Sequence, residues 1–155
     1  MALRGILELG IRDVLARGRR ELEAVAAEHG LPASDAADHL AQTLEAVPGL
    51  MVAIDAALRR PGVPGFARAM WLEVVSYLLL DADLIPAIHG DPVRGVLDDA
   101  YFLHRSAQEL QGHLSMVDMR SVDGGAQLLR GVLPPAVADD LDRRVAALRT
   151  GLGDS

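Results

Sequence analysis

Apolar residues recur at three- and four-residue intervals along most of the chain, which is the spacing of an amphipathic α-helix. The first run contains Leu3, Ile6, Leu7, Ile11, Val14, Leu15, Leu22 and Val25. It predicts one long helix, which Gly18 bends and which His29-Gly30 ends. Ser34 as an N-cap and Pro48 as a first-turn residue predict the starts of two further helices. The glycines and prolines between residues 59 and 65 predict a loop.

The most apolar helix is expected between Phe66 and Leu80, where few residues are strongly polar. A helix that is apolar on nearly every side belongs in the centre of a bundle. Pro86 disfavours helical geometry at the residue before it, and Asp91-Pro92 is typical of a new helix start. The sequence therefore predicts a central helical hairpin, whose second helix runs to about Gln111.

The rest of the chain contains a predicted turn at Asp123-Gly124-Gly125, a break at Pro134-Pro135 and a last amphipathic helix. No strand pattern competes with this interpretation. We predict an all-α fold, a single helical bundle of about six helices around the apolar hairpin. The 155 residues are expected to form one domain, with N-terminal helices in 1–60, the hairpin in 66–111 and C-terminal helices in 112–151.

Composition excludes several classes of function. The chain has no cysteine, which removes thiolate nucleophiles, disulfides and cysteine-based zinc sites. Its net charge of −7 argues against a nucleic-acid binder, because such a protein needs a basic surface to release counterions from phosphates. No nucleophile with a nearby base and no phosphate-binding loop is recognisable, so the sequence favours a protein that is not an enzyme.

The arginines of the first predicted helix offer a membrane hypothesis. They are Arg4, Arg12, Arg17, Arg19 and Arg20. A basic amphipathic helix can lie in an anionic membrane surface, although a helix packed on a soluble bundle has the same pattern. No uncharged run approaches the ~20 residues of a membrane span, and no signal peptide is recognisable. We expect a cytoplasmic protein, with membrane-surface binding through residues 1–28 as an alternative.

Three aspartates are tied to the predicted hairpin. Asp83 follows its first helix, and Asp98 and Asp99 lie early in its second helix, beside the predicted buried stripe. Buried carboxylates are costly unless they are paired, hydrogen-bonded or bound to a metal. Gly95 lies one turn before Asp99, where a glycine weakens the helix and suggests close approach of another group. The sequence therefore predicts a special site where these side chains meet.

Two interpretations of this site remain open. In the structural one, Asp98 pairs with Arg94 or Arg105, and Asp99 caps or hydrogen-bonds the turn that contains Asp83. In the other, Asp83, Asp98 and Asp99 bind a divalent cation, assisted by Asp81, Asp91 or His89. Carboxylate oxygens suit Mg²⁺, Mn²⁺ or Ca²⁺, and a bound ion could be structural or could activate water for hydrolysis.

The same residues carry a resemblance to a known family. Tyr77-Leu78-Leu79, Asp83-Leu84-Ile85-Pro86 and Gly95-Val96-Leu97-Asp98-Asp99 resemble the signature of the YkvA-like family of small helical bacterial domains. The resemblance covers about residues 71–108. The chain departs from the family pattern at Leu80-Asp81, where the family has Ser-Pro, and at Ala87, where it has an acid. Because no general biochemical role is established for that family, the resemblance implies a fold more than an activity.

The function favoured by these patterns is a non-catalytic interaction or accessory module that binds a protein partner or a second copy of itself. Abundant apolar helical surface favours it over catalysis. The alternatives are a metal-binding domain or metal-dependent hydrolase that uses the aspartates, and a peripheral membrane protein. Among the histidines, His104 is expected in the core or at its boundary rather than in catalysis, because its offset from Asp98 points it to another side of the helix.

Overall fold

The computed structural model describes residue 9 and residues 11–12, 15–16, 18–30, 33–80 and 92–153. Its helices are α2 (Arg19–Glu28), α3 (Ala33–Glu45), α4 (Val47–Leu58), α5 (Gly65–Leu80), α6 (Pro92–Glu109), α7 (Met119–Val132) and α8 (Pro135–Gly153), with a 3₁₀ turn, η2 (Gln111–His113). The described residues contain no strand. The predicted all-α helical bundle is therefore confirmed.

The long first helix that the apolar pattern predicted is interrupted at Gly18. Gly18 is the N-cap of α2, with φ −103° and ψ 9°, so a helix begins after this residue. Glycine is a poor helix former, and here it separates the helical segments on its two sides. The predicted end is confirmed, because His29 is the C-cap of α2 and Gly30 follows it with φ 73°.

The loop between α4 and α5 lies where the sequence predicted it, and an arginine on α5 holds it. Nε of Arg68 donates a hydrogen bond to the carbonyl oxygen of Leu58 (2.8 Å), and Nη2 donates to that of Arg60 (2.9 Å). Arg60 in turn donates to the hydroxyl of Ser115 (3.0 Å). The end of α4 is thereby tied both to α5 and to the segment after η2.

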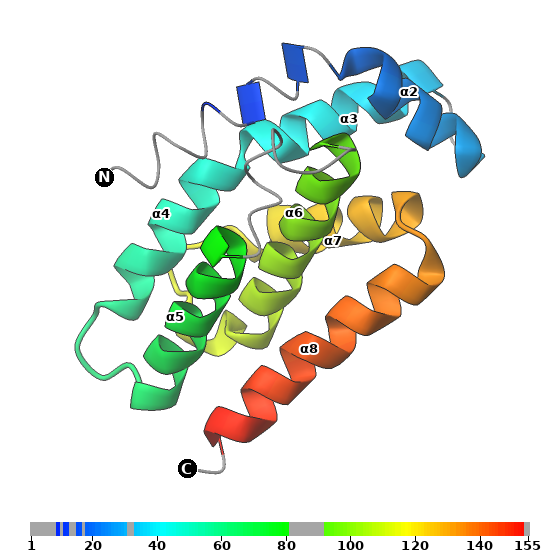
Figure 1. The fold of residues 1–155 in the computed structure, drawn as a ribbon. Helices are drawn as coiled ribbons and strands as arrows, with labels where there is room; N and C mark the ends of the chain where they lie inside the picture. Colours follow the sequence, from blue (N-terminus) through cyan, green and yellow to red (C-terminus); the bar gives the residue numbers. More distant parts are fainter. Residues whose placement is uncertain are drawn as a thin grey trace.

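The central helix is α6 rather than α5, which corrects the sequence prediction. Between Val96 and Ala107, only Asp98 and Arg105 are not buried. α6 contacts α3, α5, α7 and α8, and it lies between α5 and α8 in Figure 1. By contrast, α5 exposes 66% of Leu72. Apolar composition identified α5 as a core helix, but the position in the bundle depends on neighbours that composition does not reveal.

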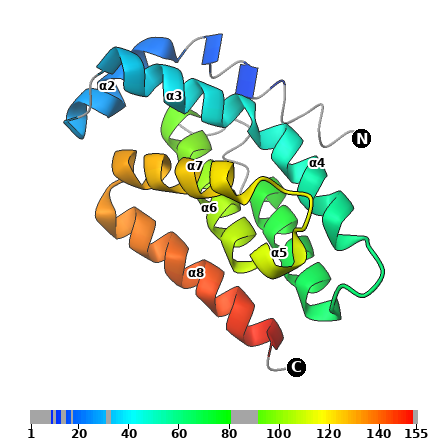
Figure 2. The ribbon, with the colours of Figure 1, turned by 180° about the vertical axis from the view of Figure 1, so that it is seen from behind.

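The C-terminal helices cover α6. α7 lies across it, as Figure 2 shows, and α8 packs along α6 and α5. The predicted turn at Asp123-Gly124-Gly125 is wrong, because these residues lie inside α7. Two arginines of α8 lie over aromatic rings, Arg149 at 4.3 Å from the ring centre of Phe66 and Arg144 at 5.7 Å from that of Tyr77. These contacts hold α8 against α5.

Candidate functional site

The two adjacent aspartates of α6 lie in different surroundings. Asp99 is only 2% exposed and lines a small enclosed space with Val47 and Leu78. Asp98 is half-buried and lines a shallow hollow with Pro134 and Val137. Successive helical residues point about 100° apart, which accounts for this divergence. Asp99 thus lies inside the core rather than at its margin, and both aspartates have interaction partners.

The other members of the predicted site fall partly outside the described residues. Asp83, Pro86, Asp81, His89 and Asp91 all lie in the part that the structure does not describe, so the meeting of Asp83 with Asp98 and Asp99 stays a prediction. In the described part of the chain, no group of three histidine or acidic residues could hold a metal ion.

The residues predicted to support the aspartates are in α6. Gly95 is half-buried there, and the backbone of Arg94 lies in its first turn. Arg105 contacts Asp142 on α8, and Gln108 and Glu109 on its own helix. The structure gives Arg105 a different role from pairing with Asp98.

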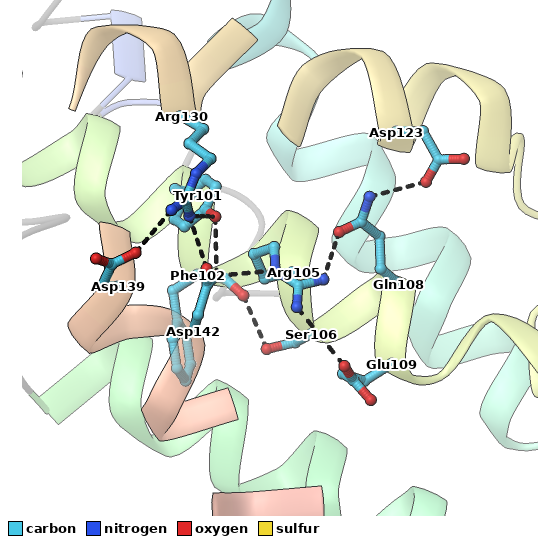
Figure 3. A network of polar contacts seen from close by, with 10 residues as sticks. All are labelled: Tyr101, Phe102, Arg105, Ser106, Gln108, Glu109, Asp123, Arg130, Asp139 and Asp142. Atoms are coloured by element: carbon cyan, nitrogen blue, oxygen red, sulfur yellow. Dashed lines mark hydrogen bonds and ion pairs between the residues drawn. The ribbon is translucent and has the colours of Figure 1, made fainter. Parts of the chain in front are cut away.

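A polar network on this side of α6 joins three helices (Figure 3). The hydroxyl of Tyr101 donates to Oδ1 of Asp142 (2.8 Å) and accepts from Nη1 of Arg130 (2.9 Å). Arg130 also contacts Oδ2 of Asp142 (2.6 Å) and Asp139 (2.7 Å). Arg105 donates to Asp142 Oδ1 (2.9 Å). Asp142 of α8 therefore receives hydrogen bonds from both α6 and α7.

The network shifts the ionisation of its members. Burial opposes ionisation of Asp142, but hydrogen bonds from Tyr101 and Arg105 outweigh it and lower the pKa of this carboxyl. Burial raises the pKa of the Tyr101 hydroxyl. The polar groups of Tyr101, Asp142 and Arg130 bind groups on neighbouring helices. The role of this network is therefore to hold α6, α7 and α8 together.

A large hollow lies between three of the helices. It is an open groove of about 670 Å³ between α3, α4 and α7, which we call the groove. Its walls include the apolar residues Leu50, Val117, Val122 and Leu128 and the small residues Ala46, Gly49 and Ala53. Met116, which is 72% exposed, stands at its edge. Its size falls in the range of ligand sites in proteins.

His104 lies at the floor of the groove. Its side chain is 4% exposed, and Nδ1 lies 2.6 Å from the carbonyl oxygen of Ala100 one turn earlier. Burial lowers the pKa of the imidazole, against the opposing effect of this hydrogen bond. The ring is therefore neutral near pH 7. This confirms His104 as a core residue, and it adds a neutral polar side chain to a groove with mainly apolar walls.

Gly125 of α7 explains how the ring fits. A Cβ atom added to this glycine would lie 2.6 Å from Nε2 of His104 and 3.4 Å from the methyl carbon of Thr43. The first distance is too short for any real contact, and the second is at the short limit of ordinary van der Waals contact. The absence of a side chain at position 125 lets α7 approach α6, and it overrides the helix-weakening effect of glycine.

The hydroxyl groups around the groove are engaged by their own helices. Thr43 donates to the carbonyl oxygen of His39 (2.9 Å), and Ser121 donates to Asp118 (2.8 Å). Asp118 is the N-cap of α7 and also accepts from the backbone N–H of Ser121 (3.3 Å). These bonds fix the walls of the groove and direct its hydroxyls to structural roles.

Sequence reasoning missed the groove, although two signals point to it. Ala46, the N-cap of α4, and Gly49 and Ala53 within it follow at three- and four-residue spacing, and small residues on one face permit close approach of another group. The pair Gly124-Gly125 also lies within a stretch of helical apolar spacing. The partner of Gly125 is His104, which is distant in the sequence, so neither signal identified the groove by itself.

Comparison with known proteins finds no matching family model and no significantly similar curated protein or solved structure. In the described part of the chain, one stretch, Asp35–Leu58, is long and apolar enough to cross a membrane by length and composition. This differs from the sequence prediction that no stretch is long enough to span a membrane. Leu40, Leu44 and Ile54 within it are fully buried in the bundle.

Proposed function

We propose that this protein is a non-catalytic interaction module that binds its partner through the groove. The observation that carries the proposal is the groove itself, a preformed open hollow with mainly apolar walls. Its hydroxyls are engaged in structural hydrogen bonds, and its one buried ionisable side chain, His104, is held by a backbone carbonyl. Such a surface is suited to binding rather than to bond chemistry.

The partner is a protein segment or a second copy of the chain. Small residues such as Gly49 and Ala53 on the groove wall let a partner backbone come close, and apolar grooves of this kind receive amphipathic helices. Met116 at the edge adds a flexible, polarisable side chain that can adapt to a partner.

Site-specific photo-crosslinking in cells tests this proposal. A crosslinking amino acid at position 116 samples the groove, and one at the exposed position 143 on α8 is the control. We expect a discrete crosslinked product, with a partner or as a homodimer, from position 116 and not from position 143. Equal labelling from both positions, or none from position 116, contradicts the proposal.

A second candidate function is divalent-metal binding by Asp83, Asp98 and Asp99, structural or in a metal-dependent hydrolase. The deep burial of Asp99 favours it, because a carboxylate inside the core requires a compensating charge or donors. Mg²⁺, Mn²⁺ or Ca²⁺ would suit these oxygens. Elemental analysis, together with thermal melts in each cation, tests it, since an ion that binds only the folded state raises the melting temperature.

We also propose membership of the YkvA-like family, on the residues given above, and a cytoplasmic location. Association with a membrane surface through residues 1–28 is the remaining alternative. Flotation with anionic liposomes, with and without residues 1–28, tests it, because binding by this segment would be lost on truncation.

A further inference from the structure

We infer that the floor of the groove is a binding site for an apolar, uncharged small molecule with one N–H or O–H donor, which Nε2 of His104 accepts. The inference rests on the proposed function only in taking the groove as a binding surface. It adds the chemistry of the ligand and the atom that recognises it.

The tautomer of His104 follows from the hydrogen bond that its Nδ1 makes. Nδ1 lies 2.6 Å from the carbonyl oxygen of Ala100. A carbonyl oxygen only accepts, so Nδ1 carries the hydrogen. In a neutral imidazole the other nitrogen is then an acceptor with a lone pair in the ring plane. Nε2 is therefore an acceptor and not a donor.

In the described part of the chain, the ring of His104 has one hydrogen-bond partner, the carbonyl oxygen of Ala100. That bond engages Nδ1, so Nε2 has no protein partner there. The side chain is 96% buried, because only 4% of it is exposed. In the described residues, Nε2 is not one of the fully buried polar atoms that lack a hydrogen-bond partner, so solvent reaches it. An acceptor that loses this contact without gaining a donor is costly. A molecule that enters the groove and displaces water from Nε2 must therefore bring its own donor or leave this atom unsatisfied.

The ring edge that carries Nε2 packs against Gly125, which is possible because position 125 has no side chain. A Cβ atom there would lie 2.6 Å from Nε2 and 2.7 Å from the neighbouring ring carbon. Gly125 and His104 both line the groove, so the contact between them borders it. The methyl group of Thr43 bounds the same spot and favours an apolar ring or chain around the donor.

The walls set the rest of the ligand's chemistry. Leu50, Val122 and Leu128 offer carbon atoms, and the acidic residue of the lining, Asp118, is engaged as the N-cap of α7. An anionic ligand would lose hydration without a counter-charge, and a cationic one would compete with the groups that Asp118 already binds. A volume of about 670 Å³ accommodates a small aromatic or aliphatic molecule.

The test compares two matched probes, indole and 1-methylindole, which differ in the single N–H donor. Binding to the full chain is followed by amide chemical shifts, and the state of His104 by the ¹⁵N shift of Nε2. We expect both probes to perturb groove residues, with indole about tenfold tighter. Indole should also move the Nε2 resonance in the direction of an accepted hydrogen bond, and 1-methylindole should not.

Two variants complete the test. His104→Leu should remove the preference for indole, whereas Gly49→Leu, which fills the groove from a position with open space around it, should weaken both probes. If His104→Leu does not fold, the Nε2 resonance of the natural protein decides alone. Equal affinities with an unmoved Nε2 resonance overturn the inference, and so does binding of neither probe in the groove. A crosslink from position 116 would still stand in both cases, so failure of the inference is distinguishable from failure of the proposed function.

Discussion

Nε2 of His104 on α6 lies 2.6 Å from the point where a side chain on Gly125 of α7 would begin. This relationship fixes how closely the two helices approach, and it forms the floor of the groove. It also joins stability to the groove, because the glycine that permits this helix packing lines the groove together with His104.

Gly125→Ala should destabilise the protein although alanine is the better helix former. The added methyl group would collide with the buried imidazole, and overpacking of this kind costs about 1–3 kcal/mol. Gly124→Ala is the matched control, since its Cβ meets nothing within 4 Å and should stabilise by up to about 1 kcal/mol. Urea unfolding of the two variants measures the difference. Similar stabilities would refute the close approach of α6 and α7.

The stability of the protein should fall as the pH is lowered from about 7 to about 5, in part through His104. Burial lowers the pKa of this histidine in the folded state. The unfolded chain therefore takes up the proton first, and stability present above the unfolded pKa of about 6.5 is lost as pH falls toward the folded value.

Unfolding free energies of the natural protein and of His104→Gln, measured across this range, test the assignment. Each affected pH unit contributes at most roughly 1.4 kcal/mol, and this slope should be shallower in His104→Gln. His39→Gln, at an exposed position on the groove edge, is the control. A loss of slope in both variants alike would contradict a special role for His104.

Asp142→Ala should detach α8 partially from the bundle. The carboxylate accepts hydrogen bonds from Tyr101, Arg105 and Arg130, and its removal leaves those donors without their acceptor, at about 1–3 kcal/mol. Asp140→Ala removes an exposed i,i+4 ion pair with Arg144 and should change stability by less than about 0.5 kcal/mol. Hydrogen exchange in α8 should rise in the first variant only.

Asp99→Ala should be more destabilising than Asp98→Ala, because Asp99 is almost fully buried and Asp98 is half-buried. Loss of a buried charged group with its partners costs about 1–3 kcal/mol or more. If a metal binds here, both variants should also lose the rise in melting temperature produced by the cation. Destabilisation without any cation effect in the natural protein would favour the structural interpretation.

Local signals in the sequence predicted much of the fold. Gly30 ends α2, Pro48 lies in the first turn of α4, and the loop after α4 lies where its prolines and glycines cluster. These features depend on the conformational limits of single residues, so they can be inferred without knowledge of the rest of the chain.

The features that the sequence did not predict depend on contacts between distant segments. Gly124-Gly125 has the composition of a turn, but both residues lie inside α7. There, Gly125 packs against the imidazole of His104. Asp99 has the charge of a surface residue, but the neighbours of α6 bury it. The groove likewise requires α3, α4 and α7 to be placed around His104, which no local pattern specifies.

The most direct measurement of the central claim is crosslinking from position 116 in a chain whose groove has been filled. Gly49→Leu places a side chain in the groove where no atom lies within 4 Å of its Cβ, and Gly131→Leu adds the same side chain to open space on α7 outside the groove. Both variants should fold. The account predicts that Gly49→Leu abolishes the crosslinked product while Gly131→Leu retains it. Undiminished crosslinking in Gly49→Leu would contradict the assignment of the groove as the binding surface.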